Sequence, residues 1–125
     1  EYGEWLGERK GLFVLYTPGY DQICTPALFL SGAQVTLFTT GRGTGIGCAL
    51  GPVMKIGTNP HLARTYADID IDAGVILEKK ASIEDVGRKI FQETLDVASG
   101  RKLTRAEQSG FHNEFKIWES LWPSL

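Results

Sequence analysis

The 125-residue sequence predicts an α/β fold with a mainly parallel sheet. Two apolar runs of strand length, 12–16 and 35–39, flank a short helical pattern, and this order is typical of a βαβ unit. The second run leads directly into a loop with glycine at every second position from Gly41 to Gly47. Strict alternation of Asp and Ile over Asp68–Asp72 predicts a further strand.

The bulk composition indicates one ordinary domain covering residues 1–125. A hydrophobic content of 42% and a charged content of 22% are enough for a packed core with a soluble surface. The net charge of −2 argues against a broad basic surface, so we expect no nucleic-acid partner. No apolar run is long enough to span a membrane and no signal-peptide pattern leads the chain, so we expect a cytoplasmic location without a membrane partner.

The first half of the chain supplies the elements of the predicted βαβ unit. Leu12–Tyr16 is continuously apolar, as in a strand covered on both faces. Thr17–Asp21 forms a turn whose polar residues can cap the next helix. That helix is predicted at Gln22–Leu30 with Pro26 in an early turn, and the second strand follows at Val35–Thr39.

The second half adds two strands and a long helix. Val53–Ile56 is the third predicted strand, and a short helix follows at His61–Tyr66. The clearest amphipathic helix begins at Ser82 and runs through Ala98. Residues 103–110 read as a surface loop or one helical turn. Aromatic residues recur at helical spacing over 111–122, which is typical of a segment docked on a core.

The glycine loop is the strongest candidate for a binding site. Glycine permits positive φ and lets backbone N–H groups approach an anion, and Arg42 offers a planar fork that matches a carboxylate. The loop lacks the Gly-Lys-Ser/Thr ending of a phosphate-binding P-loop and the glycine spacing of a dinucleotide fingerprint. The plainer alternative is a loop whose glycines only permit tight turns.

Lys55 is the second candidate, because it interrupts an apolar strand soon after the loop. A lysine there could neutralise an acidic substrate or serve as a base if desolvated. It could equally be an edge-strand lysine that prevents aggregation.

Three aspartates, Asp68, Asp70 and Asp72, would share one face of a strand. They could bind a hard divalent cation, but isoleucines inward and aspartates in water explain the alternation equally well. An EF-hand is excluded because Ala73 and Lys79 occupy the positions of its invariant glycine and bidentate glutamate.

The histidines and cysteines leave several alternatives open. His61 could be a general base, a metal ligand or a solvated residue at a helix start, and His112 reads as a surface residue. Cys24 and Cys48 are expected as reduced thiols, although a disulfide or metal site would need only that the fold bring them together.

Several short motifs, in this order and spacing, carry a family resemblance. They are Thr17-Pro-Gly-Tyr-Asp21, Gly32-Ala-Gln34, Phe38-Thr-Thr-Gly-Arg-Gly-Thr44, Lys55-x-x-Thr-Asn59, Ile69-Asp-Ile-Asp-Ala-Gly74 and Val97-Ala-Ser-Gly100. From about Leu12 onward the chain resembles the C-terminal part of the altronate dehydratase and galactarate dehydratase family. The large subunits of sulfolactate sulfo-lyases look similar too.

The resemblance implies a hydro-lyase that dehydrates altronate or galactarate to a keto-deoxy acid in hexuronate or aldarate catabolism. It implies a divalent metal, Fe2+ in most members, bound mainly outside this segment, and a Rossmann-like three-layer architecture. The chain, which starts at Glu1, would then be a C-terminal fragment, inactive alone, whose partners are the remainder of the same polypeptide and, in a homo-oligomer, other copies. The alternatives are a sulfo-lyase and a non-catalytic module that binds a sugar acid or another anion.

Within this reading, we expect Lys55 to be catalytic by offsetting developing charge, while metal ligands remain unassigned. The predicted substrate-binding residues are Thr39, Thr40, Gly41, Arg42, Gly43, Thr44, Thr58 and Asn59.

Overall fold

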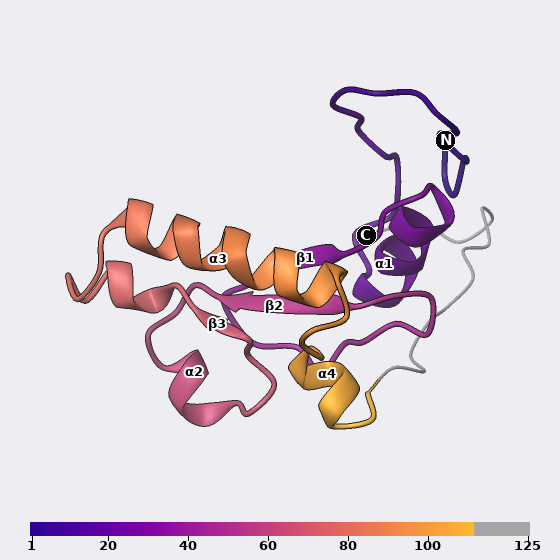
Figure 1. Ribbon diagram of the computed structural model, residues 1–125. Helices are drawn as coiled ribbons and strands as arrows, with labels where there is room; N and C mark the ends of the chain where they lie inside the picture. The colour runs from indigo at the N-terminus through magenta and orange to yellow at the C-terminus, as the bar shows by residue number, and fades with distance from the viewer. Residues whose placement is uncertain (112–125) are drawn as a thin grey trace.

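The computed structural model describes residues 1–111 (Figure 1). Its elements follow in the order α1 Asp21–Leu30, β1 Thr36–Thr40, β2 Val53–Gly57, α2 Leu62–Thr65, β3 Ile71–Asp72, the 3-10 helix η1 Gly74–Ile76, α3 Ile83–Ala98 and α4 Arg105–Gln108. The predicted docking of the aromatic tail concerns residues that, except for Phe111, lie outside this described part.

The three strands form a parallel sheet in the order β1-β2-β3. Phe38 of β1 pairs with Lys55, and Ile56 of β2 pairs with Ile71 of β3. The predicted α/β class with a parallel sheet is therefore confirmed. Because β2 is the central strand and all its residues are buried, the interpretation of Lys55 as an edge-strand lysine is wrong.

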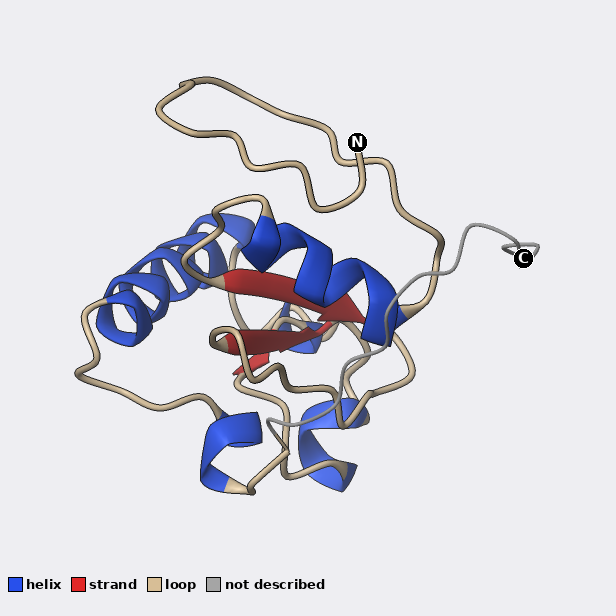
Figure 2. Cartoon of the chain, turned by 90° about the vertical axis from the view of Figure 1, so that its right-hand side faces the viewer, coloured by secondary structure: helices blue, strands red, loops and turns tan. Residues whose placement is uncertain are grey.

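Alternate residues of β2 point into two separate apolar clusters. Met54 and Ile56 pack with Val86 and Val97 of α3. Val53 belongs to the other cluster, which includes Phe29 of α1 together with Ile46 and Cys48 of the glycine loop and partly buried Phe38. The sheet therefore lies between α3 on one face and α1 with the loop on the other (Figure 1, Figure 2).

The strand predicted at Leu12–Tyr16 is not present. Leu12 and Val14 are 96% and 94% exposed, and the segment passes outside the sheet without regular structure. An apolar run becomes a strand only when a neighbouring edge supplies its hydrogen bonds, and within residues 1–111 β1 pairs only with β2. The predicted βαβ unit around α1 is therefore wrong, and residues 41–52 alone connect parallel β1 to β2.

Both longer helices were expected, but their details differ. α1 begins after Tyr20 without a side-chain cap, and Pro26 lies inside the helix rather than in its first turn, so the carbonyl of Gln22 loses its helical donor. α3 begins as predicted with a reciprocal capping box between Ser82 and Asp85. Its apolar side is only partly covered, because several of its large side chains remain exposed, among them Ile83, Phe91 and Leu95.

The strand at the Asp–Ile alternation is shorter than expected, because only Ile71–Asp72 pairs with β2 as a strand. Ile69 and Ile71 are buried, as predicted. Asp70, however, does not face water freely: it lies partly buried between β2 and the start of α4, the single helical turn at Arg105–Gln108.

Candidate functional site

The carboxyl ends of β1 and β2 bring four of the predicted site residues together. Thr40 ends β1, and its carbonyl accepts hydrogen bonds from the Thr58 N–H at 2.9 Å and the Thr58 hydroxyl at 3.2 Å. The side-chain amide of Asn59 donates to the Gly41 carbonyl at 3.4 Å. Two segments separated in sequence therefore form one edge, as expected for neighbouring parallel strands.

The threonines within the glycine loop brace the loop itself. The Gly43 N–H donates to the Thr40 hydroxyl at 3.0 Å, and the Ile46 N–H donates to the Thr44 hydroxyl at 3.3 Å. The Thr44 hydroxyl also donates to Asp21 Oδ2 at 3.3 Å, which joins the loop to the start of α1. A hydroxyl that braces a loop keeps further hydrogen-bonding capacity. Bracing the loop is therefore compatible with a contact to a substrate.

The backbone conformation at Gly43 requires a glycine. Its φ of +87° lies in the left-handed region, and an added Cβ would lie 3.4 Å from the Leu62 and Tyr66 side chains. The loop thus turns back over α2 at the residue immediately after Arg42.

Arg42 lies at this edge and is exposed. Within residues 1–111 its guanidinium has no hydrogen-bond or ion-pair partner. Thr39 is also exposed, on the opposite side of β1 from Phe38. The arrangement can therefore present one arginine and several braced backbone and hydroxyl groups to an anion.

Lys55 lies beneath the loop rather than beside Arg42. Its side chain is fully buried, and Nζ donates to the Ile46 carbonyl at 3.3 Å. The lysine therefore connects the central strand to the second half of the glycine loop, among the other contacts that it makes.

Asp70 completes this network, although the sequence suggested for it only a possible cation site and no contact with Lys55. Its Oδ2 accepts from the Lys55 backbone N–H and its Oδ1 from the Arg105 N–H, both at 2.7 Å. Burial raises the pKa of Asp70 above its ordinary value, while these two hydrogen bonds and the charge of Lys55 oppose the rise. Asp70 thus holds α4 against β2, a role that the Asp–Ile alternation alone did not indicate.

Gly74 lies directly against the backbone of Asn59 and Pro60. A Cβ on Gly74 would lie 2.5 Å from the Pro60 nitrogen and 2.8 Å from the Asn59 carbonyl carbon, so only glycine fits without moving that backbone. Asn59 Oδ1 also accepts the His61 N–H at 3.0 Å. His61 itself is the exposed residue preceding α2, and within the described part it belongs to no cluster of metal-binding side chains.

The described residues contain no cluster of metal-binding side chains. Within 1–111 there is no group of three or more His, Cys, Asp and Glu side chains arranged to hold an ion. The cation site considered for Asp68, Asp70 and Asp72 is therefore not formed there. Cys24 and Cys48 are free thiols, as expected, and burial raises the pKa of the Cys24 thiol.

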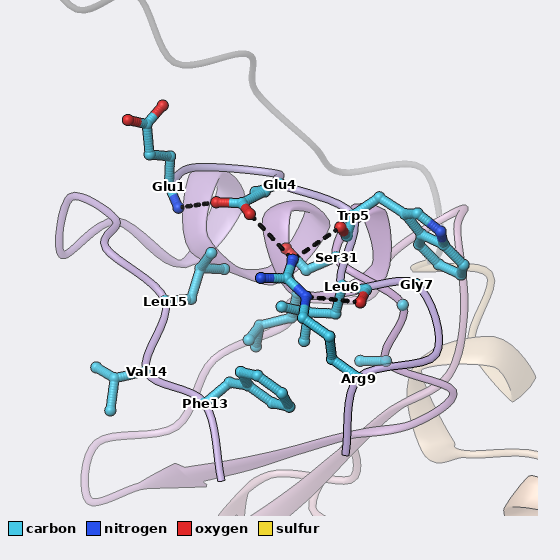
Figure 3. A pocket seen from close by; sticks show the side chains of 13 residues that line it. Glu1, Glu4, Trp5, Leu6, Gly7, Arg9, Phe13, Val14, Leu15 and Ser31 are labelled. Atoms are coloured by element: carbon cyan, nitrogen blue, oxygen red, sulfur yellow. Dashed lines mark hydrogen bonds and ion pairs between the residues drawn. The ribbon is translucent and has the colours of Figure 1, made fainter. Parts of the chain in front are cut away.

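A pocket of about 430 Å³ lies elsewhere, between the N-terminal segment and the end of α1 (Figure 3). Its lining includes Trp5, Phe13 and Leu28. Arg9 binds Glu4 and the Trp5 and Leu6 carbonyls, so this arginine closes the N-terminal segment on itself. No motif in the sequence indicated this pocket, because it depends on the path of residues 1–16, which form no strand.

No helix of the described residues has the length and apolar character needed to cross a membrane.

Comparison with known proteins identifies relatives across nearly the whole chain. The family described as D-galactarate/altronate dehydratase, C-terminal, matches residues 1–122. The chain is 42% identical to galactarate dehydratase (L-threo-forming) of Escherichia coli over 111 residues, 88% of this chain and 21% of the relative. It is 40% identical to altronate dehydratase of Bacillus subtilis over 121 residues, 96% of this chain and 24% of the relative.

A third relative is the beta subunit of (2R)-sulfolactate sulfo-lyase from Chromohalobacter salexigens, 35% identical over 94 residues, which make up 72% of this chain and 24% of the relative. The chain thus spans less than a quarter of the length of these relatives.

Proposed function

Because this chain belongs to the D-galactarate/altronate dehydratase C-terminal family, we propose that it supplies the carboxylate-binding part of a sugar-acid hydro-lyase. The substrate is altronate or galactarate, and the product is a keto-deoxy acid. The single observation that carries the proposal is the exposed Arg42 in a braced glycine loop at the carboxyl edge of a parallel sheet.

Such a dehydration needs a fixed carboxylate. A proton leaves the carbon next to the carboxylate, hydroxide leaves the neighbouring carbon, and the resulting enol rearranges to the keto acid. Negative charge builds up on the carboxylate side as the proton departs, so positive charge and N–H donors placed there beforehand stabilise the transition state. In our proposal Arg42 and the loop amides of Gly41–Thr44, except the Gly43 N–H that donates to Thr40, bind the carboxylate, and Thr39, Thr58 and Asn59 contact substrate hydroxyls.

Lys55 acts from below in this scheme. Its buried ammonium group donates to the Ile46 carbonyl and so holds the loop in place. The same positive charge adds a favourable potential beneath the bound acid. Lys55 is the predicted catalytic residue of this segment. Because its side chain is fully buried, we expect it to act through its electrostatic field and not by contact with the substrate.

The proposal places the remaining chemistry in the rest of the polypeptide. The side chains of residues 1–111 do not fit a divalent metal, so an Fe2+ ion of the family would bind to residues outside them. We further propose that the parallel sheet is one end of a larger Rossmann-like fold. The whole protein would work in the cytoplasm, in hexuronate or aldarate breakdown, without a nucleic-acid or membrane partner and with other copies as partners in a homo-oligomer.

Two alternatives rest on specific observations. The sulfo-lyase relative favours a reaction in which sulfite rather than hydroxide leaves. The exposed Arg42 in a braced glycine loop would also suit a module that binds a sugar acid without converting it.

A substrate screen separates these functions. The full-length protein with Fe2+ is incubated with altronate, galactarate and sulfolactate, and keto-acid and sulfite formation are measured. We expect a keto-deoxy acid from one of the two sugar acids. Sulfite release from sulfolactate would establish the sulfo-lyase instead, and binding without turnover of all three would establish the module.

The Arg42→Ala variant of the full-length protein tests the carboxylate site. Loss of a charge-assisted bidentate contact should lower kcat/KM by about 100-fold or more. Lys89→Ala removes a positive charge from the exposed side of α3, on the other face of the sheet, and should leave kcat/KM nearly unchanged. Near-normal turnover by Arg42→Ala would end the assignment.

A further inference from the structure

Helix α3 carries more apolar surface than the sheet covers. Val86 and Val97 are buried in the cluster with β2 and β3, and Ile90 packs partly against it. Ile83 and Phe91 remain 70% and 66% exposed. At about 100° per residue, the buried and exposed sets occupy neighbouring arcs of the helix. Among the charged residues, Glu84 lies within the exposed arc and the others lie on the remaining side.

The exposed arc forms one continuous stripe, which we call the α3 outer face. It consists of Ile83, Gly87, Phe91, Leu95 and Ala98. A Cβ placed on Gly87 would meet no atom within 4 Å, so the middle of the stripe is open. Figures 1 and 2 show the sheet on one side of α3 and no described element over its outer side (Figure 1, Figure 2). Single exposed apolar residues are common on protein surfaces, but a stripe of this length beside a shallow glycine position is typical of a packed face.

We propose that the α3 outer face packs against the part of the longer polypeptide that lies outside residues 1–125. The relatives are at least four times as long as the matched segment, so most of such a chain is absent from this structure. Leu12 and Val14 are exposed apolar residues at a second place. A symmetric contact between the α3 helices of two copies would leave these two residues uncovered. Packing within a longer chain could cover both the α3 outer face and this second place. The inference rests on the family assignment and does not require the proposed dehydratase activity.

Photo-crosslinking of the full-length protein tests this inference. Phe91→p-benzoylphenylalanine places a light-activated group on the α3 outer face while keeping an aromatic ring. Lys89→p-benzoylphenylalanine places the same group on the charged side of the same helix and serves as the control. The experiment is run on an equal mixture of unlabelled and 15N-labelled protein, and crosslinked peptides are identified by mass spectrometry.

We expect the probe at residue 91 to link to a peptide outside 1–125 of the same isotopic label, with several-fold higher yield than the control. Links between light and heavy peptides, links to residues 112–125, or equal yield from the two positions would overturn the proposal. As an independent readout, Phe91→Gln should lower the Tm of the full-length protein by several degrees, whereas Lys89→Gln, which places the same side chain on the charged side, should not. Neither readout depends on turnover.

Discussion

At the scale of single residues, the glycine loop depends on groups that hold its own backbone. The Thr40 and Thr44 hydroxyls accept hydrogen bonds from N–H groups of the loop, and Lys55 Nζ donates one to the Ile46 carbonyl from beneath it. Arg42 takes no part in this bracing within the described residues, so it is the group that the loop presents. A loop held in this way would not have to become ordered in order to bind the proposed carboxylate, which favours affinity.

Gly43→Ala tests whether this loop conformation matters for function. An alanine at φ +87° is strained, so the free energy of unfolding should fall by about 1–2 kcal/mol. Gly100→Ala is the matched control, because Gly100 has φ +71° and open space but ends α3. We expect similar losses in thermal or denaturant unfolding of the full-length protein.

Only Gly43→Ala should also lower kcat/KM beyond what its stability loss explains. Equal kinetic effects of the two variants would show that the loop geometry has no specific role.

At the scale of elements, short polar residues at helix starts fix where the helices lie. Ser82 and Asp85 cap α3 reciprocally, and Asp70 links the start of α4 to β2. The pKa of Asp85 is lowered from 3.8 to about 2, first because the Ser82 hydroxyl binds its carboxylate and then because Arg88 pairs with it. α3 is thereby anchored at its first turn, close to the exposed Ile83.

This lowered pKa predicts a pH dependence. A carboxyl whose folded pKa lies below its unfolded value stabilises the fold above the unfolded pKa and loses that contribution as the pH falls toward the folded one. The Tm difference between the full-length protein and its Asp85→Asn variant should therefore be largest above pH 5 and shrink between pH 4 and pH 2. A difference that stays constant across this range would contradict the capping role.

At the scale of the whole molecule, the described part is a small sheet with a helix on each face and apolar residues left outside. Its three strands leave an unpaired edge at β1 within residues 1–111, where Leu37 is 44% exposed. The proposed carboxylate site lies at one end of this sheet, and the described residues supply no metal-binding cluster. Binding and proton transfer would then be divided between this segment and the remainder of the polypeptide.

Residues 1–125 expressed alone should therefore form no keto acid from altronate or galactarate with Fe2+ present, while the full-length protein should. The reason is that the segment offers only the proposed anion site, and its residues 1–111 contain no cluster of metal-binding side chains that could activate a leaving hydroxide. The measurement is product formation at equal molar concentration, with circular dichroism of the segment as the control for folding. Turnover by the folded segment would contradict the divided site.

The sequence alone was sufficient for the α/β class, the family and the start and length of α3. These depend on local signals: residue periodicity, acidic residues after a polar helix start, and short motifs at fixed spacing. Three outcomes needed the tertiary structure: the central burial of Lys55, the two amides bound by Asp70, and the absence of a strand at Leu12–Tyr16. Each depends on which distant backbone supplies a hydrogen-bond partner, and the composition of a segment does not contain that information.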